Sequence, residues 1–249
     1  MQKVAVIIPT YNERENIAPL VTEILALGLP GYIVVVDDNS PDGTGALADE
    51  MAARHPQVQV VHRPGKMGLG RAYLAGFARA FELDVDMALT MDADFSHHPR
   101  YIPNLVRLVT DEGRDIAIGS RYVPGGGTRN WGVGRQLLSG GANFVARTTL
   151  GLRAHDCTAG FRCYRRSLLE TAPLDRIFSD GYSFLIELLY RCQRMGCTVG
   201  ESPIIFEDRR AGQSKISKNE IARAGYTVLR LASERLLRRG PSPVRTARR

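Results

Sequence analysis

The first 120 residues alternate between short runs rich in β-branched residues and longer amphipathic segments. The runs predict strands at residues 4–8, 33–37, 58–62, 87–91 and 116–120, and the segments between them predict helices at 13–27, 42–54, 69–82 and 100–111. Strand-to-helix units at such short intervals are typical of a parallel sheet that carries helices on both faces. The pattern therefore predicts an α/β fold with a mostly parallel, twisted sheet.

This alternation ends near residue 121. Residues 124–134 are rich in glycine and predict a long loop, and further helices are expected at 135–150 and 182–195. The tetrad Ser217-Lys218-Asn219-Glu220 is a capping box, which predicts a last basic amphipathic helix over about 217–239. We expect residues 1–240 to form a single domain and residues 241–249 to be a disordered basic tail.

Three local signals mark the starts of helices. Ser40 and His98 each precede a proline, so each is predicted to cap a helix N-terminus. Residues 65–70 (GKMGLG) follow the third predicted strand, but their spacing is not that of the G-x-G-x-x-G motif. We therefore expect a loop that leads into a helix and not a dinucleotide site.

The composition excludes several classes of protein. No apolar run approaches the roughly 18 residues that a membrane-spanning helix needs, and residues 1–9 lack the features of a secretory signal. The four cysteines match neither zinc-knuckle nor Cys-x-x-Cys spacing, so we expect reduced thiols in the interior: Cys157, Cys163, Cys192 and Cys197. These observations predict a cytoplasmic protein.

Charge is distributed unevenly along the chain. Residues 209–249 hold 12 lysines and arginines against two glutamates, a net +10, whereas the first 208 residues hold 21 basic and 24 acidic residues, a net −3. A basic segment suits anionic lipid or a phosphorylated substrate. Its single aromatic residue, Tyr226, provides no stacking platform, so nucleic acid is not expected as a partner.

The last predicted helix leaves two interpretations open. It carries an apolar stripe that consists of Ile221, Val228, Leu229, Ala232 and Leu236. That stripe either packs on the domain, with the arginines in solvent, or lies on an anionic membrane surface.

Polar residues follow three of the predicted strands. They are residues 9–13 (PTYNE), 37–43 (DDNSPDG) and 92–94 (DAD). Because ligands of open parallel sheets gather at the carboxyl ends of the strands, these segments are expected to border one crevice. Helix capping accounts for Ser40 and Asp42, but it does not account for the adjacent pair Asp37 and Asp38.

The Asp-x-Asp segment is the sharpest signal in the chain. In extended backbone Asp92 and Asp94 project to the same side, and two carboxylates so close repel each other unless a cation lies between them. A hard divalent cation held by one or two carboxylates completes its shell with water and phosphate oxygens. The pair therefore predicts a site for Mg²⁺ or Mn²⁺ beside a phosphate-bearing ligand.

Other polar residues have both a functional and a structural interpretation. Asp156 and Glu187 are candidate bases or sugar contacts, or else buried hydrogen-bond acceptors. Trp131 is a candidate lid or lipid contact, or else an anchoring residue. His97 and His98, next to a proline, are expected to cap a helix or line a pocket rather than to bind metal.

In their order, these motifs closely resemble a glycosyltransferase of family 2 with the GT-A fold. The segments that carry the resemblance are 9–13 (PTYNE), 36–44 (VDDNSPDGT), 68–70 (GLG) and 91–94 (MDAD). Further segments are similar to the dolichol-phosphate, or polyprenol-phosphate, mannosyltransferase branch: 97–99 (HHP), 141–144 (GANF), 206–209 (FEDR) and 212–215 (GQSK). The resemblance spans roughly residues 3–225.

The resemblance implies GDP-mannose as donor, polyprenyl phosphate as acceptor and Mg²⁺ or Mn²⁺ as cofactor. It implies donor contacts at Pro9, Tyr11, Glu13, Val36, Asp38, Asp92, Ala93, Asp94, Ser96, Arg121, Arg209 and Lys215. It implies catalytic roles for Asp92, Asp94, Arg121, Arg209 and Lys215, with Asp92 and Asp94 as metal ligands. It places the acceptor phosphate at Arg121, Arg135 and Ser139, and the start of a helix there would favour an anion. Some relatives carry glutamine at the position of Ser96 and leucine at that of Cys157.

The chemistry that the resemblance implies is inversion at the sugar by attack of the acceptor phosphate. A phosphate monoester has its second pKa near 6, so around pH 7 it is largely dianionic and needs no dedicated base. Two alternatives stay open: a different nucleotide sugar or acceptor, and a non-catalytic domain that only binds nucleotide sugar. We expect peripheral association with the cytoplasmic face of a membrane, directly on anionic lipid or through a membrane-protein partner.

Overall fold

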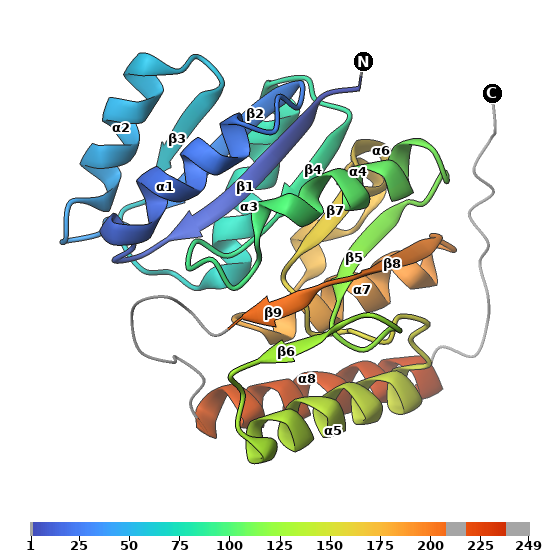
Figure 1. The fold of residues 1–249 in the computed structure, drawn as a ribbon. Helices are drawn as coiled ribbons and strands as arrows, with labels where there is room; N and C mark the ends of the chain where they lie inside the picture. Colours follow the sequence, from blue (N-terminus) through green and yellow to red (C-terminus); the bar gives the residue numbers. More distant parts are fainter. Residues whose placement is uncertain (1, 208–217, 238–249) are drawn as a thin grey trace.

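The structure, a computed structural model, describes residues 2–207 and 218–237, with the side chains of the last helix described over 222–235. Within these residues a seven-stranded sheet has the strand order β3-β2-β1-β4-β7-β5-β8 (Figure 1). Its strands are β1 (Val4–Thr10), β2 (Gly31–Asp37), β3 (Val58–His62), β4 (Met87–Thr90), β5 (Ile116–Ser120), β7 (Arg162–Arg165) and β8 (Val199–Pro203). The first five coincide with the predicted strands to within about two residues at each end.

The sheet is mostly parallel, as predicted. One strand of the described sheet, β7, runs antiparallel to both neighbours, β4 and β5. It lies in the segment between the predicted helices 135–150 and 182–195, where the sequence pattern was mixed. The register pairs Thr10 with Asp37 and Ile7 with Thr90, so β1, β2 and β4 end side by side.

Two hydrophobic layers cover the sheet because alternate residues of each strand face opposite sides. Ala5 and Ile7 of β1 pack with α3 (Leu69–Glu82) and α7 (Ser183–Arg194). Val6 and Ile8 pack with α1 (Arg14–Leu25), α2 (Thr44–Arg54) and α4 (Ile102–Thr110). Both faces are therefore buried, which explains why the strands read as nearly continuous apolar runs.

The N-cap predicted at Ser40 is wrong. Helix α2 begins at Thr44, after Gly43 at φ +87°. The backbone N–H and the hydroxyl of Ser40 donate instead to the carboxylate of Asp37. The carboxylate of Asp42 accepts from the N–H and the hydroxyl of Thr44. Side-chain hydrogen bonds thus build a turn between β2 and α2, and this turn accounts for Asp37 without a ligand.

The cap predicted at His98 is confirmed. His98 Nδ1 accepts a hydrogen bond from the backbone N–H of Arg100, with Pro99 at the first position of the short helix η1 (Pro99–Tyr101). Proline lacks an N–H, so at this position it leaves no donor unsatisfied.

The loop predicted at 124–134 contains a short strand. β6 (Gly127–Arg129) pairs in parallel with β9 (Ile205–Glu207) in a separate two-stranded sheet. A strand of three residues gives no period, and its partner lies far along the chain, so the sequence pattern did not predict it.

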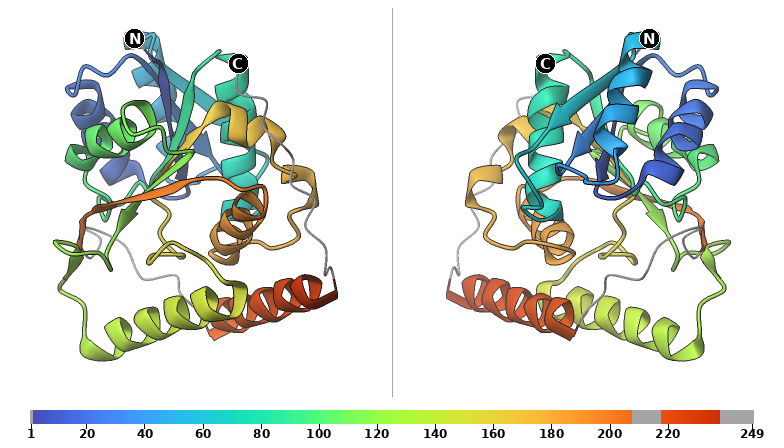
Figure 2. Two further views of the ribbon diagram at one scale, coloured as in Figure 1. Left: turned by 90° about the vertical axis from the view of Figure 1, so that its right-hand side faces the viewer. Right: turned by 90° about the vertical axis from the view of Figure 1, so that its left-hand side faces the viewer.

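Helices α5 (Val133–Leu150) and α8 (Lys218–Leu237) lie side by side beneath the sheet, as Figures 1 and 2 show. Two short helices, α6 (Arg166–Thr171) and η2 (Leu174–Arg176), precede α7. On α8 Val228 and Leu231 are buried, whereas Tyr226 and Leu229 are 60% and 71% exposed. One side of α8 therefore packs on the domain and another faces out. In the described part of the chain, no helix combines the length and the apolar character needed to cross a bilayer.

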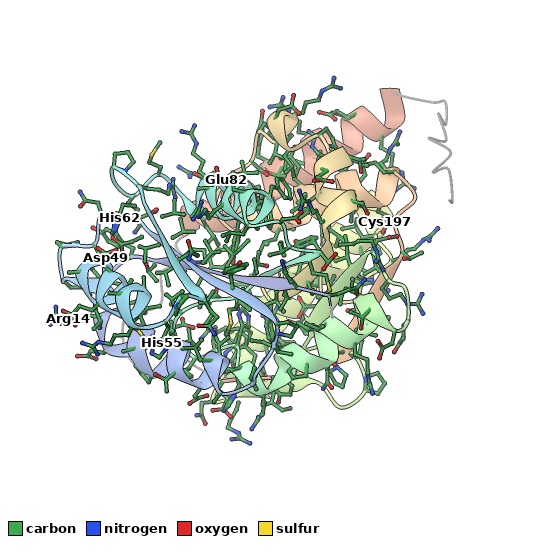
Figure 3. All side chains as sticks on the ribbon, turned by 90° about the horizontal axis from the view of Figure 1, so that it is seen from above. Arg14, Asp49, His55, His62, Glu82 and Cys197 are labelled. Carbon is green, nitrogen blue, oxygen red and sulfur yellow. The ribbon has the colours of Figure 1, made fainter. Side chains whose placement is uncertain are left out.

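The four cysteines are free and buried, which confirms the prediction of thiols in the interior. Burial raises the pKa of Cys157, Cys163 and Cys197 to about 12, so these thiols stay protonated near neutral pH. Figure 3 places Cys197 on the opposite side of the molecule from His62 and Asp49, whose contact of 2.9 Å joins β3 to α2.

Candidate functional site

The carboxyl ends of β1, β2 and β4 open onto a cavity of about 560 Å³. Seven residues predicted to contact the donor line it: Pro9, Tyr11, Glu13, Asp38, Asp92, Ala93 and Asp94. They come together because the three strands are parallel and end side by side, so each following loop begins at the same edge of the sheet. The predicted crevice is therefore present.

Asp38 forms a buried ion pair with Arg63 on one wall of this cavity. The distance from Arg63 Nη1 to Asp38 Oδ1 is 2.6 Å, and the side chains are 7% and 9% exposed, respectively. Burial raises the pKa of Asp38, and the charge of Arg63 offsets part of that rise. Arg63 Nη1 also donates to the carbonyl of Gly68, at 3.4 Å, so the pair ties the end of β2 to the loop before α3.

Gly68 allows that loop to approach the segment that precedes α7. Its φ is +96°, and a Cβ at this position would lie 2.1 to 2.4 Å from the carboxylate atoms of Asp180. Only glycine adopts this backbone conformation without a steric cost and leaves room for the carboxylate. Gly68 and Asp180 thereby close one side of the cavity.

Replacing Gly68 by alanine is expected to weaken binding of the nucleotide sugar by about ten-fold and to destabilise the fold by roughly 1–3 kcal/mol, because backbone strain and a collision with Asp180 arise together. Titration calorimetry with the free nucleotide measures the first effect, and urea unfolding measures the second. Gly113→Ala is the matched control, since Gly113 also has a positive φ, +67°, but has nothing within 4 Å. If the two variants bound nucleotide equally well, the role of the Gly68–Asp180 contact would be wrong.

The lining also includes Lys66, Asp180, Tyr182 and Arg223, to which the sequence pattern assigned no role in donor binding. The Lys66 ammonium lies 4.8 Å from the centre of the Tyr11 ring and forms a cation–π contact with this residue, which directly follows β1. Asp180 and Tyr182 lie within the three residues before α7, and the N-cap residue Tyr182 makes no side-chain capping hydrogen bond. Nothing in the sequence pattern indicated that this helix start lies beside α3.

Asp92 and Asp94 line both this cavity and a second one. The backbone N–H of Asp92 donates to His97 Nδ1 at 3.1 Å, and Asp94 Oδ1 accepts from the N–H of Ser96 at 3.1 Å. Burial lowers the pKa of His97, with Asp92 opposing the effect, so its imidazole is neutral near pH 7 and accepts at Nδ1. His97 therefore holds the Asp-x-Asp turn by a hydrogen bond rather than by charge.

The donor set at Asp92 and Asp94 suits a hard divalent cation. Among the described residues there is no group of three or more histidine, cysteine or acidic side chains that would form a metal site by itself. Mg²⁺ and Mn²⁺ do not require one, since two carboxylates with phosphate oxygens and water complete their shell. The residues present therefore fit a cation that is bound together with a diphosphate.

The second cavity has a volume of about 680 Å³ and is lined in part by residues of α5 and α8. Its apolar lining includes Leu137, Leu138 and Val145 of α5, Ile186 of α7, and Val228 and Leu229 of α8. The three residues predicted to bind the acceptor phosphate also line it: Arg121, Arg135 and Ser139. The cavity thus combines apolar side chains with cations and reaches the Asp92–Asp94 pair.

Arg121 is held by a carboxylate that the sequence left with two interpretations. Its Nε and Nη2 donate to the two oxygens of Asp156, both at 2.7 Å, and Nη2 also donates to Thr158 Oγ1 at 2.8 Å. The side chains are 8% and 0% exposed. Burial opposes ionisation of Asp156, but the charge of Arg121 outweighs it and lowers the pKa of Asp156. The bidentate pair fixes the guanidinium at the cavity wall.

The same structural interpretation applies to Glu187. It is fully buried, and its carboxylate accepts from the N–H groups of Phe178 and Ser179 and pairs with Arg191. Asp156 and Glu187 are thus buried hydrogen-bond acceptors, the second of the two roles considered for them.

The predicted site residues not yet placed are Val36, Ser96, Arg209 and Lys215. Val36 is fully buried in β2 among the hydrophobic core and is not in the lining of either cavity. Ser96 lines the second cavity rather than the first. Arg209 and Lys215 lie outside the described residues, as do Ser217 of the predicted capping box and the predicted tail at 241–249.

The family model for "Glycosyl transferase family 2" matches residues 5–172, about two thirds of the chain. The chain belongs to glycosyl transferase family 2. The match covers the segments that carry Asp38, Asp92 and Asp94, together with Arg121 and Arg135. The two cavities described above are therefore features of a family 2 glycosyltransferase.

Curated relatives of this glycosyltransferase place it in the predicted branch. It is 49% identical over 228 residues to the polyprenol monophosphomannose synthase of Mycolicibacterium smegmatis, covering 91% of this chain and 86% of the relative. It is 44% identical over 229 residues to the undecaprenyl-phosphate mannosyltransferase of Micrococcus luteus, covering 92% and 93%. The resemblance to polyprenyl-phosphate mannosyltransferases is thereby confirmed.

Solved structures similar to this glycosyltransferase confirm the GT-A fold. Glucosyl-3-phosphoglycerate synthase of Mycobacterium tuberculosis, in complex with Mn²⁺, UDP and glucosyl-3-phosphoglycerate, has a TM-score of 0.67 at 24% identity, covering 93% of this chain and 80% of that one. Mannosyl-3-phosphoglycerate synthase of Rubrobacter xylanophilus has a TM-score of 0.68 at 19% identity, covering 98% and 77%. At these identities the likeness concerns the fold.

Proposed function

We propose that this glycosyltransferase transfers mannose from GDP-mannose to a polyprenyl phosphate, with inversion at the anomeric carbon. The observation that carries the proposal is the pair of cavities that meet at Asp92, Asp94 and Tyr182. One cavity opens at the strand ends, where nucleotides bind in such sheets, and the other joins arginines to an apolar lining. A lipid phosphate has the same combination of anionic head and apolar chain. The names of the two curated relatives support the choice of sugar and acceptor.

The donor half follows from the groups in the first cavity. Asp38 lines this cavity, and its carboxylate accepts hydrogen bonds. Guanine presents two adjacent N–H donors on its Watson–Crick edge, whereas uracil presents one, so this carboxylate favours guanine. Asp92 and Asp94 would hold Mg²⁺ or Mn²⁺, which would supply positive charge to the departing diphosphate. A Mn²⁺ complex of a neighbour with the same fold is consistent with this assignment. The expected contacts of Arg209 and Lys215 with the donor are part of the proposal.

The acceptor half follows from the second cavity. The phosphate would lie at Arg121, Arg135 and Ser139, which hold it by charge and hydrogen bonds. Its oxygen forms a bond to the anomeric carbon while the bond from that carbon to the β-phosphate oxygen of GDP breaks, and GDP leaves with the electron pair. The acceptor dianion needs no proton removed, and Asp156 and Glu187 are already occupied by buried hydrogen bonds. Placement of two anionic substrates is then the main task of the site.

A panel of nucleotide sugars tests this function. Purified protein is incubated with Mg²⁺ or Mn²⁺, a short polyprenyl phosphate and one donor at a time. Transfer from GDP-mannose alone is the expected result. Transfer from UDP-glucose would replace the proposed donor, and nucleotide binding without transfer from any donor would favour a non-catalytic domain.

We also propose that α5 and α8 dock on an anionic membrane surface. Seven large apolar side chains of these helices are exposed: Val133, Leu137, Leu138, Phe144, Val145, Tyr226 and Leu229. In the rest of the described chain only Met67 is a large apolar residue of comparable exposure. Such a patch marks an interaction surface, and the basic character of residues 209–249 suits anionic lipid. We place this surface on the cytoplasmic side of the membrane, with a membrane-protein partner as the alternative.

The double variant Val133→Glu and Phe144→Glu is expected to lose at least ten-fold in binding to anionic vesicles. Each change removes an exposed apolar side chain, whose burial in the membrane would contribute about 1.5–3 kcal/mol, and adds a negative charge that anionic lipid repels. Flotation with vesicles of anionic and of neutral phospholipid measures the bound fraction. Thr22→Glu with Ala53→Glu adds the same charge on α1 and α2 and should keep vesicle binding. Equal binding of both double variants would contradict docking through α5.

A further inference from the structure

Trp131 lies in the lining of the second cavity, two residues before α5, and its indole nitrogen has no role in the contacts described so far. Its Nε1 is buried and has no hydrogen-bond partner in the described part of the chain. An indole nitrogen donates and does not accept, and a buried donor without an acceptor is costly. Such a group therefore points to an acceptor atom supplied by a ligand or a water.

Two arginine side chains lie over the ring of Trp131. The Arg135 guanidinium carbon lies 4.1 Å from the ring centre and that of Arg121 lies 5.5 Å from it. Phe206 of β9 packs edge-on against the same ring, at 5.3 Å between centres. Because guanidinium groups bind favourably over an aromatic face, Trp131 positions Arg135 beside Arg121, which Asp156 already fixes.

Other groups around this point are also hydrogen-bond donors. Tyr122 Oη donates to Ser139 Oγ at 2.8 Å, which leaves the hydroxyl proton of Ser139 for another acceptor. Helix α5 begins at Val133, two residues after Trp131, and the N-terminus of a helix favours an anion. Two guanidinium groups, an indole N–H, a hydroxyl and a helix start suit a group with several anionic oxygens, such as a phosphate.

We propose that Trp131 is a specificity-determining residue of the acceptor site: its indole N–H donates to an oxygen of the acceptor's phosphate, and its ring positions the Arg135 guanidinium. The inference rests on the proposed function, since that function supplies the lipid phosphate. It adds a neutral donor to the charged groups expected there, and it explains a buried N–H that no described residue satisfies.

The chain offers a direct readout, because Trp131 is its single tryptophan. Titration of the wild-type protein with farnesyl phosphate is expected to change the tryptophan emission in a saturable manner. Farnesol, which has the same chain without the phosphate, is expected to change it several-fold less at equal concentration. An equal response to both compounds, or no response to either, would overturn the contact between the indole and the phosphate.

Two variants separate the N–H from the ring. Trp131→Phe keeps an aromatic face for Arg135 and removes the donor, so the KM for polyprenyl phosphate is expected to rise about ten-fold, with the KM for the donor and kcat at saturating acceptor within two-fold. Trp131→Leu removes both and is expected to raise the acceptor KM further. Tyr32→Phe is the control: it removes the hydroxyl group of an aromatic residue near the start of β2, which lines neither cavity. An unchanged acceptor KM in Trp131→Phe would overturn the proposal.

Calorimetric binding of farnesyl phosphate distinguishes failure of this inference from failure of the proposed function. If the wild-type protein transferred no sugar to any acceptor, the function would be wrong, and the binding comparison between wild type and Trp131→Phe would still decide the role of Trp131. About ten-fold weaker binding by a variant that melts at the wild-type temperature supports it. Equal binding refutes it.

Discussion

Asp94→Asn is expected to reduce kcat by on the order of 10²–10³-fold while the protein stays folded. Asparagine has the same shape, and its Oδ1 still accepts the hydrogen bond from the N–H of Ser96, so the turn after β4 is kept. What is lost is one of two negative charges at the junction of the two cavities. Loss of one carboxylate is expected to weaken the cation site strongly, because the remaining carboxylate alone binds Mg²⁺ or Mn²⁺ weakly.

Turnover at several concentrations of Mn²⁺ measures this prediction, and the variant is expected to need a higher concentration for half of its residual rate. Asp111→Asn removes an exposed carboxylate at the end of α4 and should change turnover by less than two-fold. Circular dichroism checks that the Asp94→Asn variant is folded. Wild-type turnover in the folded variant, or an unchanged metal requirement, would mean that Asp94 does not serve the cation.

Asp156→Ala is expected to have the largest effect on stability, a loss of about 3–5 kcal/mol in the free energy of unfolding. The substitution leaves the guanidinium of Arg121, 8% exposed, without the carboxylate that both its Nε and Nη2 contact. Urea unfolding followed by circular dichroism gives the value. Glu234→Ala, which breaks a partly exposed pair 3.9 Å long with Arg230, is the control and is expected to cost less than about 1 kcal/mol.

A double variant keeps this prediction separate from the role of Arg121 in the site. Arg121→Met with Asp156→Leu replaces the buried pair by apolar side chains and is expected to recover most of the lost stability. Transfer to polyprenyl phosphate is expected to stay strongly reduced, because the arginine at the acceptor cavity is gone. A loss below 1 kcal/mol in Asp156→Ala would show that the pair does not stabilise the fold.

The same pair predicts how stability depends on pH. The folded-state pKa of Asp156 is below its ordinary value of 3.8, so the folded state binds this proton less readily than the unfolded chain does. Its contribution is therefore fully present above about pH 4–5 and is lost as the pH falls through the folded-state pKa. Asp156→Asn lacks this contribution, so the difference in stability between wild type and variant should shrink on acidification.

Much of the donor cavity was predictable because its groups follow strands that local patterns reveal. β-Branched runs located β1, β2 and β4, and parallel strands end at a common edge, so Asp38 and Asp92 were expected to meet. Asp180 and Lys66 were not predicted, since their place depends on how α7 and the loop before α3 approach each other. Gly68 permits that approach, but its φ of +96° is a property of the folded chain.

The acceptor side shows the same division. The positions of Arg121 and Arg135 were expected from resemblance, but the sequence left Asp156 between a catalytic and a structural role, and only its hydrogen bonds to Arg121 decided between them. The strand β6 and its pairing with β9, which bring Trp131 to Phe206, had no signal in the sequence.

The order of strands and helices, the acidic groups at the strand ends and the family were determined by the sequence itself, because side-chain period and chain order are local properties. The tertiary structure alone decided which partner each buried charge takes, where the indole of Trp131 lies and which side of α8 faces outward. These depend on contacts between segments far apart in the chain, and the free energy of such contacts is set by packing and desolvation, which no local pattern records.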